Sequence, residues 1–217
     1  MEKTTKKSRA HIQYKLADGT KVPGVTTILN ILAKPALVPW ANRLGLQGID
    51  VGKYVDEKAD IGTCAHYLIH CDLTGETPDL SEYSPSTVDA AENGFLKWLD
   101  WKKGKKIEAV ESELPLVSEF RKYGGTIDIY CLLDGVPTLI DIKTSGSGIY
   151  PEMRYQVAAY RVLLIDSGRH GHQALIIRVG RDDTEGFQVE RVGDLDKLYL
   201  VFSHCLDIYR LQKELKV

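Results

Sequence analysis

Three consecutive β-type segments constrain the fold of this chain more than any other feature of its sequence. Residues 107–117, 124–133 and 137–143 are rich in β-branched and aromatic residues and are separated by short turns such as Asp134-Gly135. Because turns of that length join neighbouring antiparallel strands, these segments predict a three-stranded antiparallel meander. The rest of the chain has to be arranged around it.

The segments on both sides of the meander are mainly helical. Apolar residues recur at helical spacing, and turn residues separate the periodic stretches. The pattern predicts a hairpin at 11–23, a helix at 28–32 capped by Thr26 or Thr27, helices at 37–44, 53–73, 85–103 and 151–166, strands at 173–179 and 187–191, and a terminal helix at 194–214. This order favours an α/β fold in which a central mixed β-sheet is flanked by helices.

No internal repeat or long linker divides the 217 residues, so we expect a single domain. Its parts are an N-terminal hairpin and helical segment at 1–105, a core at 106–180, and a C-terminal strand and helix at 181–217. The sequence has no apolar run of about 18 residues and no signal peptide, which predicts a soluble, intracellular protein with no membrane partner.

Charge and cysteine usage narrow the function classes. A formal net charge of -2 argues against a protein that coats nucleic acid through a strongly basic surface. Local basic patches remain, and each is equally well explained as a solvated tail or loop: Lys3, Lys6, Lys7 and Arg9, then Lys102, Lys103, Lys105 and Lys106. The four cysteines form no CxxC pair, so neither zinc nor an iron-sulfur cluster is predicted: Cys64, Cys71, Cys131 and Cys205.

Charged residues interrupt two strands of the meander. Alternation places Ile127 and Ile129 on one face of the second strand and Asp128 on the other. In the third strand, the same alternation puts Asp141 and Lys143 together on one face. Antiparallel pairing of these strands would bring Asp128 close to Asp141.

Two facing carboxylates repel each other, and a hard cation such as Mg2+ removes that repulsion while leaving positions open for a phosphate. Lys143 beside them could orient or deprotonate a water, or neutralise charge that develops on the phosphate. The alternative is an ordinary solvated salt bridge between Asp141 and Lys143, because D-x-K is common by chance.

The context of these residues favours the first interpretation. The stretch Gly124 to Asp128 contains G-x-x-D, Asp141-Ile142-Lys143 is D-x-K, and Gln156 to Tyr160 is Q-x-x-x-Y on the following helix. In this order and spacing they resemble the PD-(D/E)XK nuclease superfamily, closest to its RecB-like and phage exonuclease branch. Gly62 to His66 resembles the G-x-x-x-H of the same branch. The resemblance covers about residues 24–165.

The resemblance implies a restriction-endonuclease-like catalytic core and a set of roles. Its implied metal ligands are the side chains of His66, Asp128 and Asp141, the backbone carbonyl of Ile142, and Glu113 as a further acid. Lys143 would be the catalytic lysine, with Gln156 and Tyr160 beside it. Many superfamily members carry Glu where this chain has Asp141, although Asp is usual in the RecB-like branch.

Other residues are candidates with equally good structural explanations. Thr144 and Ser145 could contact a phosphate, and Trp40 with Arg43 could stack on a base and grip a phosphate. Trp40 fits a core position equally well. We expect the ring of Tyr160 to be core, as is typical of an apolar helix face.

Two more expectations concern His70 and the acids of the first strand. His70 is expected to be structural or exposed. Glu111 and Glu113 are expected on the same face of their strand, because they are two residues apart.

The resemblance therefore implies an Mg2+- or Mn2+-dependent DNA exonuclease of recombination, repair or phage replication, in a bacterium or an infected host. Its partners would be DNA, single-stranded or with free ends, and a recombination or single-strand-binding protein. The alternatives are a catalytically inactive nuclease-like module that binds a DNA structure or a partner, an iron-sulfur nuclease of CRISPR adaptation, and a restriction endonuclease. Intact Asp128, Asp141 and Lys143 argue against the inactive module.

Overall fold

The computed structural model describes residues 12–216, and its centre is one five-stranded sheet of order β1-β2-β3-β4-β5. The strands are β1 (Ile107–Ser118), β2 (Tyr123–Leu133), β3 (Val136–Lys143), β4 (Gln173–Val179) and β5 (Phe187–Arg191). The first three form the predicted antiparallel meander, β4 runs parallel to β3, and β5 returns antiparallel to β4. The sheet is therefore mixed, as the sequence predicts.

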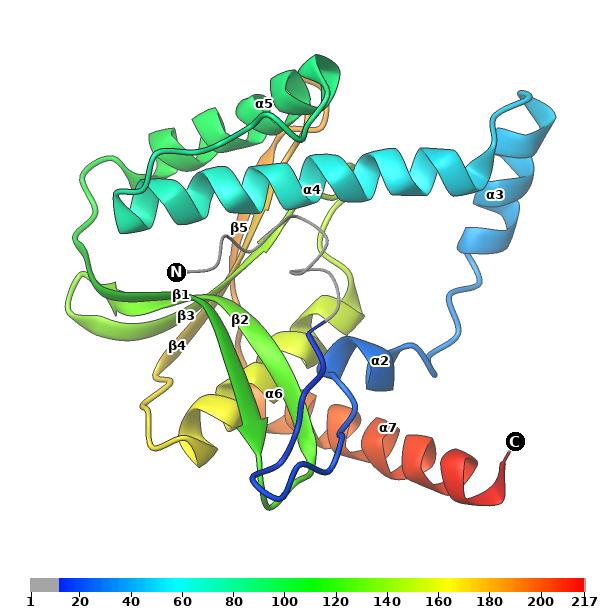
Figure 1. Ribbon diagram of the computed structural model, residues 1–217, viewed down its shortest axis with the longest axis vertical. Helices are drawn as coiled ribbons and strands as arrows, with labels where there is room; N and C mark the ends of the chain where they lie inside the picture. The colour runs from blue at the N-terminus through cyan, green and yellow to red at the C-terminus, as the bar shows by residue number, and fades with distance from the viewer. Residues whose placement is uncertain (1–11, 217) are drawn as a thin grey trace.

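Helices cover both faces of the sheet (Figure 1). On one face lie α4 (Val51–Thr74) and α5 (Pro85–Lys102), and on the other α2 (Val25–Leu29), α6 (Pro151–Asp166) and α7 (Leu195–Leu215). The short helix α3 (Leu37–Leu46) lies at the N-terminal end of α4 and has no buried residue. In the described part of the chain, no helix is long and apolar enough to cross a membrane.

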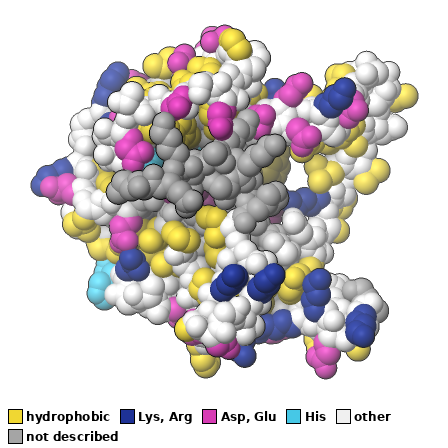
Figure 2. All heavy atoms as spheres, viewed as in Figure 1, with side chains coloured by type: hydrophobic (Ala, Val, Ile, Leu, Met, Phe, Trp, Pro, Cys, Tyr) yellow, Lys and Arg dark blue, Asp and Glu magenta, His cyan; other side chains and the backbone are white. Residues whose placement is uncertain are grey.

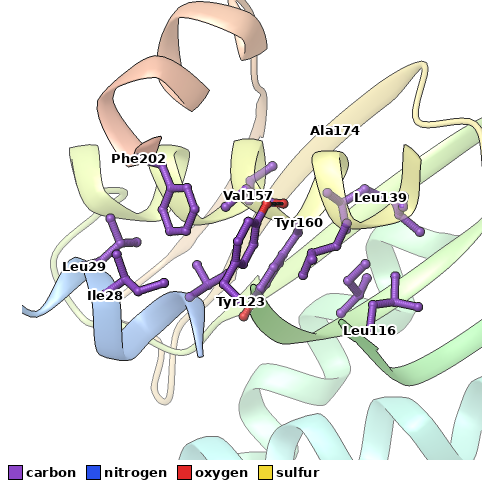
Figure 3. Packing of buried hydrophobic residues seen from close by; sticks show 14 of the residues in the cluster. Ile28, Leu29, Leu116, Tyr123, Leu139, Val157, Tyr160, Ala174 and Phe202 are labelled. Carbon is purple, nitrogen blue, oxygen red and sulfur yellow. Dashed lines mark hydrogen bonds between the residues drawn. The ribbon is translucent and has the colours of Figure 1, made fainter. Parts of the chain in front are cut away.

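Each face of the sheet has its own apolar cluster. Tyr123, Ile127, Tyr160 and Phe202 are buried between the sheet and helices α6 and α7 (Figure 3). On the opposite face, a second cluster under α4 and α5 contains Trp98, Ile129 and Ile142, among others. The four cysteines are free and buried.

Two N-terminal predictions need correction. The hairpin at 11–23 is reduced to one bridge between Lys15 and Lys21, and its first residue lies outside the described part, as do Lys3, Lys6, Lys7 and Arg9. Helix α2 begins at Val25 after Gly24, with no side-chain cap from Thr26 or Thr27. Burial of Val25, Ile28 and Leu29 stabilises this helix, and no side-chain hydroxyl caps it.

The predicted alternation along β2 is wrong at its centre. Ile127 packs on the α6 side of the sheet, whereas Ile129 packs on the α4 side. The cause lies opposite Asp128 on β1, where Glu113 has a left-handed φ of 54° between the paired residues Ser112 and Leu114. A left-handed residue interrupts the two-residue repeat, so the side chains of both strands change face at this point.

The same break separates the two acids of β1. Glu111 forms an ion pair with Arg169, which follows α6, at 2.7 Å. Glu113 instead lines a cavity with His66 of α4. The prediction that both acids share one face is therefore wrong, since it assumed an uninterrupted strand.

Candidate active site

Strands β2 and β3 stop pairing at the point where their carboxylates begin. Their ladder runs from Leu133 opposite Val136 to Ile129 opposite Ile140. The next residues are Asp128 and Asp141. There, Oδ2 of Asp128 accepts a hydrogen bond of 2.7 Å from the backbone N–H of Ile142. The carboxylate thus takes the place of a backbone partner, which fixes its position against β3.

Three side chains from three elements meet around Asp128. His66 of α4 places Nδ1 3.5 Å from Oδ1 of Asp128. One ligand atom from each of His66, Glu113 and Asp128 can be chosen so that all lie within 4.8 Å of one another. Beside them is a cavity of about 350 Å³, also lined by Lys58, Tyr67 and Thr144. The left-handed conformation of Glu113 on β1 directs its side chain toward His66 and Asp128.

A glycine lets α4 approach so closely. A Cβ added at Gly62 would lie 2.8 Å from Oγ1 of Thr144, just after the end of β3. A side chain at this position would force either Thr144 or α4 to shift, and a shift of α4 would carry His66, one helical turn later, away from Asp128. Close packing thus favours glycine in the G-x-x-x-H motif.

Asp141 and Lys143 share one face of β3, as predicted, and Nζ of Lys143 lies 2.8 Å from Oδ2 of Asp141. Asp141 is 1% exposed, and among the described residues neither of its oxygens is satisfied by a well-formed hydrogen bond. Lys143 also donates to Oε1 of Gln156 at 3.2 Å, and Gln156 donates to the hydroxyl of Tyr160 at 2.8 Å. The solvated salt bridge is excluded, because β3 is central and Asp141 is buried.

Burial and mutual charge set the protonation of these groups. Burial raises the pKa of Asp141 to about 6, despite the attraction of Lys143. Burial opposes ionisation of Asp128, but His66, Lys143 and the Ile142 N–H outweigh it and lower its pKa.

Before a cation binds, the two basic groups of the site are held in their charged forms, and His66 would have to release its proton to act as a metal ligand. Burial lowers the pKa of His66, yet the charge of Asp128 and its hydrogen bond dominate and raise it to about 9. Burial lowers the pKa of Lys143, and Asp141 and Asp128 together raise it above its ordinary value. Lys143 is therefore a cation at neutral pH.

These residues fit a divalent metal ion. An imidazole and carboxylates are common donors for such ions, and buried Asp141 keeps one oxygen, Oδ1, without a polar partner among the described residues, which is costly unless a ligand fills that place. The structure groups Asp128 with His66 and Glu113, and Asp141 with Lys143. The two carboxylates occupy neighbouring strands at the same end of the interrupted ladder, as the predicted pairing requires.

The accessory candidates fall into different environments. Thr144 lines the cavity, but Ser145 donates its hydroxyl to the Gly148 carbonyl at 2.9 Å within its own loop. Trp40 packs edge-on against Tyr54 of α4, with ring centroids 6.0 Å apart, so it does not enter the main core. Arg43 is exposed on the same helix.

One supporting residue escaped the sequence analysis. Ser112 donates its hydroxyl to the backbone carbonyl of Asp128 at 3.1 Å, and Nδ1 of His70 lies 3.0 Å from the same hydroxyl. His70 is structural, as predicted. A lone serine between two glutamates gives no signal of this role, which depends on the break in β1. Lys58 and Tyr67 were also missed, because only the tertiary fold places them at the cavity.

No protein-family model and no curated protein sequence matches this chain. Among solved structures it is similar to an alkaline exonuclease (LHK-Exo) from Laribacter hongkongensis at 14% identity, with 73% of this chain and 91% of that chain covered and a TM-score of 0.35. LHK-Exo in complex with dAMP matches at 15% identity, with 74% and 86% covered and a TM-score of 0.41. A protein described as SSO0001 matches at 14% identity, with 70% and 74% covered and a TM-score of 0.36.

These solved structures match the chain only at low similarity. Their identities of 14–15% and TM-scores of 0.35–0.41 transfer no activity to this chain. The function has to be argued from the side chains of the site.

Proposed function

We propose that this protein is a deoxyribonuclease that depends on Mg2+ or Mn2+ and hydrolyses DNA phosphodiester bonds, acting as an exonuclease. The observation that supports it most directly is buried Asp141, whose Oδ1 has no polar partner among the described residues and whose Oδ2 has only the Lys143 ammonium, at 2.8 Å. A structural ion pair would be costly to bury so incompletely. A site that receives a cation and a phosphate explains the arrangement.

The candidate ligands of the metal are His66, Glu113, Asp128 and Asp141, with the backbone carbonyl of Ile142. When bound, a divalent cation polarises the phosphodiester and lowers the pKa of water. The hydrogen bond from the Ile142 N–H holds Asp128 in place before any ligand arrives. Preorganised ligands of this kind reduce the cost of binding.

Lys143 supplies the positive charge that a phosphate transition state requires. Its ammonium is held by Asp141 on one side and by Gln156 on the other. The Tyr160 hydroxyl accepts from Gln156, which fixes the amide so that its oxygen faces the lysine. Because its pKa is raised, Lys143 acts in this proposal as a cation that stabilises developing charge.

DNA binding is compatible with the small negative net charge, because charge is unevenly distributed. Figure 2 shows acidic side chains over α4 and basic side chains gathered lower on the same face, near α7. The basic residues of α7 are Lys197, Arg210 and Lys213, and Lys216 follows the helix. Thr144 at the cavity is a candidate phosphate contact, and Trp40 with Arg43 stay weaker candidates for a strand that passes α3.

The test is digestion of end-labelled DNA, single-stranded and double-stranded, linear and circular, with Mg2+ or Mn2+ and with a chelator. We expect metal-dependent loss of linear DNA and resistance of circles, since an exonuclease needs ends. Cleavage of circles would replace the exonuclease with an endonuclease. Metal-dependent DNA binding without cleavage would instead show the inactive nuclease-like module.

A further inference from the structure

Strand β5 forms an uncovered edge of the sheet. It pairs with β4 alone among the described strands, and four of its five residues are exposed. Phe187 and Val189 are 39% and 38% exposed, and Leu96 of neighbouring α5 is 61% exposed. A shallow cavity of about 350 Å³, lined in part by Leu96, Trp101 and Phe187, separates helix from strand. An uncovered edge with outward-directed backbone groups and exposed apolar side chains is a template for another strand.

The backbone hydrogen bonds show which residues face the open side. Gly180 N–H donates to the Gly186 carbonyl at 3.0 Å, and Val192 N–H donates to the Ala174 carbonyl at 2.9 Å. Antiparallel strands direct the backbone groups of alternate residues to the same neighbour. Gln188 and Glu190 therefore bond to β4, and Phe187, Val189 and Arg191 direct their N–H and C=O groups outward.

We propose that β5 pairs with β5 of a second copy of this chain, antiparallel about a two-fold axis at Val189. In this register Val189 faces Val189, Phe187 faces Arg191, and Gln188 faces Glu190. Each outward-directed backbone group then meets an outward-directed group, so a continuous ladder forms across the two copies. The two sheets become one ten-stranded sheet.

The number of residues that can pair selects this register among those that the backbone allows. A two-fold axis at Glu190, whose carboxylate is held by Arg154, would also align outward-directed residues, but it would leave Phe187 beyond the paired residues. An axis at Gln188 would leave Arg191 beyond the paired residues. The register centred on Val189 pairs all five residues, sets the Arg191 guanidinium against the Phe187 ring, and opposes no like charges.

The apolar surface beside the strand supports a second copy as the occupant. Phe187 and Val189 lie on the face of the sheet that α5 covers, since they pair with Val179 and Ile177 of that cluster. A two-fold pairing brings α5 of both copies to the same side of the joined sheet. The second copy would then cover Leu96 as well as the strand. A lone extended peptide brings no second α5 and would cover less of this surface.

Disulfide cross-linking of the full chain tests the register directly. Val189→Cys should form a covalent dimer under mild oxidation, because the two residues 189 face each other on the axis. Gln188→Cys is the matched control, since residue 188 faces residue 190 in the second copy. The native cysteines are buried, so background cross-linking should be low. Equal cross-linking of both variants, or of neither, would overturn the proposal.

Light scattering of the full chain provides the second measurement, and it does not depend on any nuclease activity. The parental protein should have twice the mass of one chain. Val189→Lys sets like charges on the axis and should weaken the dimer by about tenfold or more. Gln188→Lys should leave it intact, because the new lysine faces Glu190. A monomeric parent, or a dimer that Val189→Lys leaves unchanged, contradicts the proposal, and the first result would favour an extended peptide of another protein as the occupant.

Discussion

Two ion pairs of this protein, Arg181–Glu185 and Lys143–Asp141, differ in how completely their carboxylates are hydrogen-bonded. Arg181 and Glu185 are each 14% exposed, and every oxygen of Glu185 accepts from the guanidinium or backbone N–H of Arg181. Asp141 is more deeply buried, yet its only polar partner among the described residues is the Lys143 ammonium, 2.8 Å from Oδ2.

In the proposed function, the difference separates a pair that stabilises the fold from a pair that also takes part in binding and catalysis. Arg178, next to the satisfied pair, donates to the carbonyls of Ser145 and Glu185, which fastens the loop that follows Lys143. The Arg181–Glu185 pair is complete without anything else. Asp141 and Lys143 retain bonding capacity, which costs stability and is available for chemistry.

The strongest test of this contrast is Asp141→Asn. Cleavage should be abolished, as it should be for Asp128→Asn, because an amide cannot replace a charged ligand. Burial raises the pKa of Asp141 to about 6, so its charged form costs folding free energy above that pH and none below its ordinary pKa.

In a chelator at pH 8, Asp141→Asn should therefore be more stable than the parent by up to about 3 kcal/mol, and the advantage should shrink as the pH falls below 6. Thermal melting at several pH values measures this gain. Near-normal metal-dependent cleavage by the variant would show that Asp141 is not a ligand.

The next largest effect is expected for Lys143→Ala. Single-turnover cleavage should slow by orders of magnitude, while DNA affinity measured in Ca2+ should change little, since the charge acts in the transition state. A structural role alone would give the reverse, a loss of stability of about 3 to 5 kcal/mol, as for one partner removed from a buried ion pair, with cleavage preserved at a temperature where the variant is folded. Cleavage at the parental rate would remove the catalytic assignment and most of the case for a nuclease.

The smallest effect on cleavage is expected from the satisfied pair. Glu185→Gln should lower stability near pH 7 by roughly 1 to 3 kcal/mol, because charged hydrogen bonds to Arg181 are lost. These hydrogen bonds lower the pKa of Glu185, so their contribution is present above its ordinary pKa and disappears as the pH falls through the lowered one.

The difference in melting temperature between Glu185→Gln and the parent should accordingly vanish in acid, while cleavage at a temperature where both are folded stays within a few-fold. A loss of cleavage as large as that of Asp141→Asn would erase the distinction between the two pairs.

Local pattern was sufficient for most of the fold. The bounds of α6, β4 and β5 are as predicted, because their apolar periodicity is uninterrupted and turn residues delimit them. Asp141 and Lys143 were correctly placed on one face for the same reason. The start of α2 was missed, since Gly24 gives no hydroxyl signal and packing of Val25 decides the boundary.

The wrong predictions concentrate around one residue whose backbone φ angle differs from that of a strand. The left-handed conformation of Glu113 moves Ile127 and Ile129 to opposite faces and separates Glu113 from Glu111. Nothing in the residue type announces it, since glutamate is not a residue that favours positive φ. The contact between His66 and Asp128 likewise depends on how α4 crosses the sheet. The family resemblance had implied that both residues are metal ligands.

The interrupted ladder between β2 and β3 would influence how Asp128 holds a cation in the proposed site. One lone pair of Oδ2 of Asp128 is engaged by the Ile142 N–H, so the oxygen that faces His66 has the freer lone pairs. Binding through that single oxygen would leave the hydrogen bond undisturbed. Octahedral ions such as Mg2+ accept single carboxylate oxygens readily, whereas Ca2+ often takes both oxygens of one carboxylate. The backbone of β3 would thus favour the smaller ion.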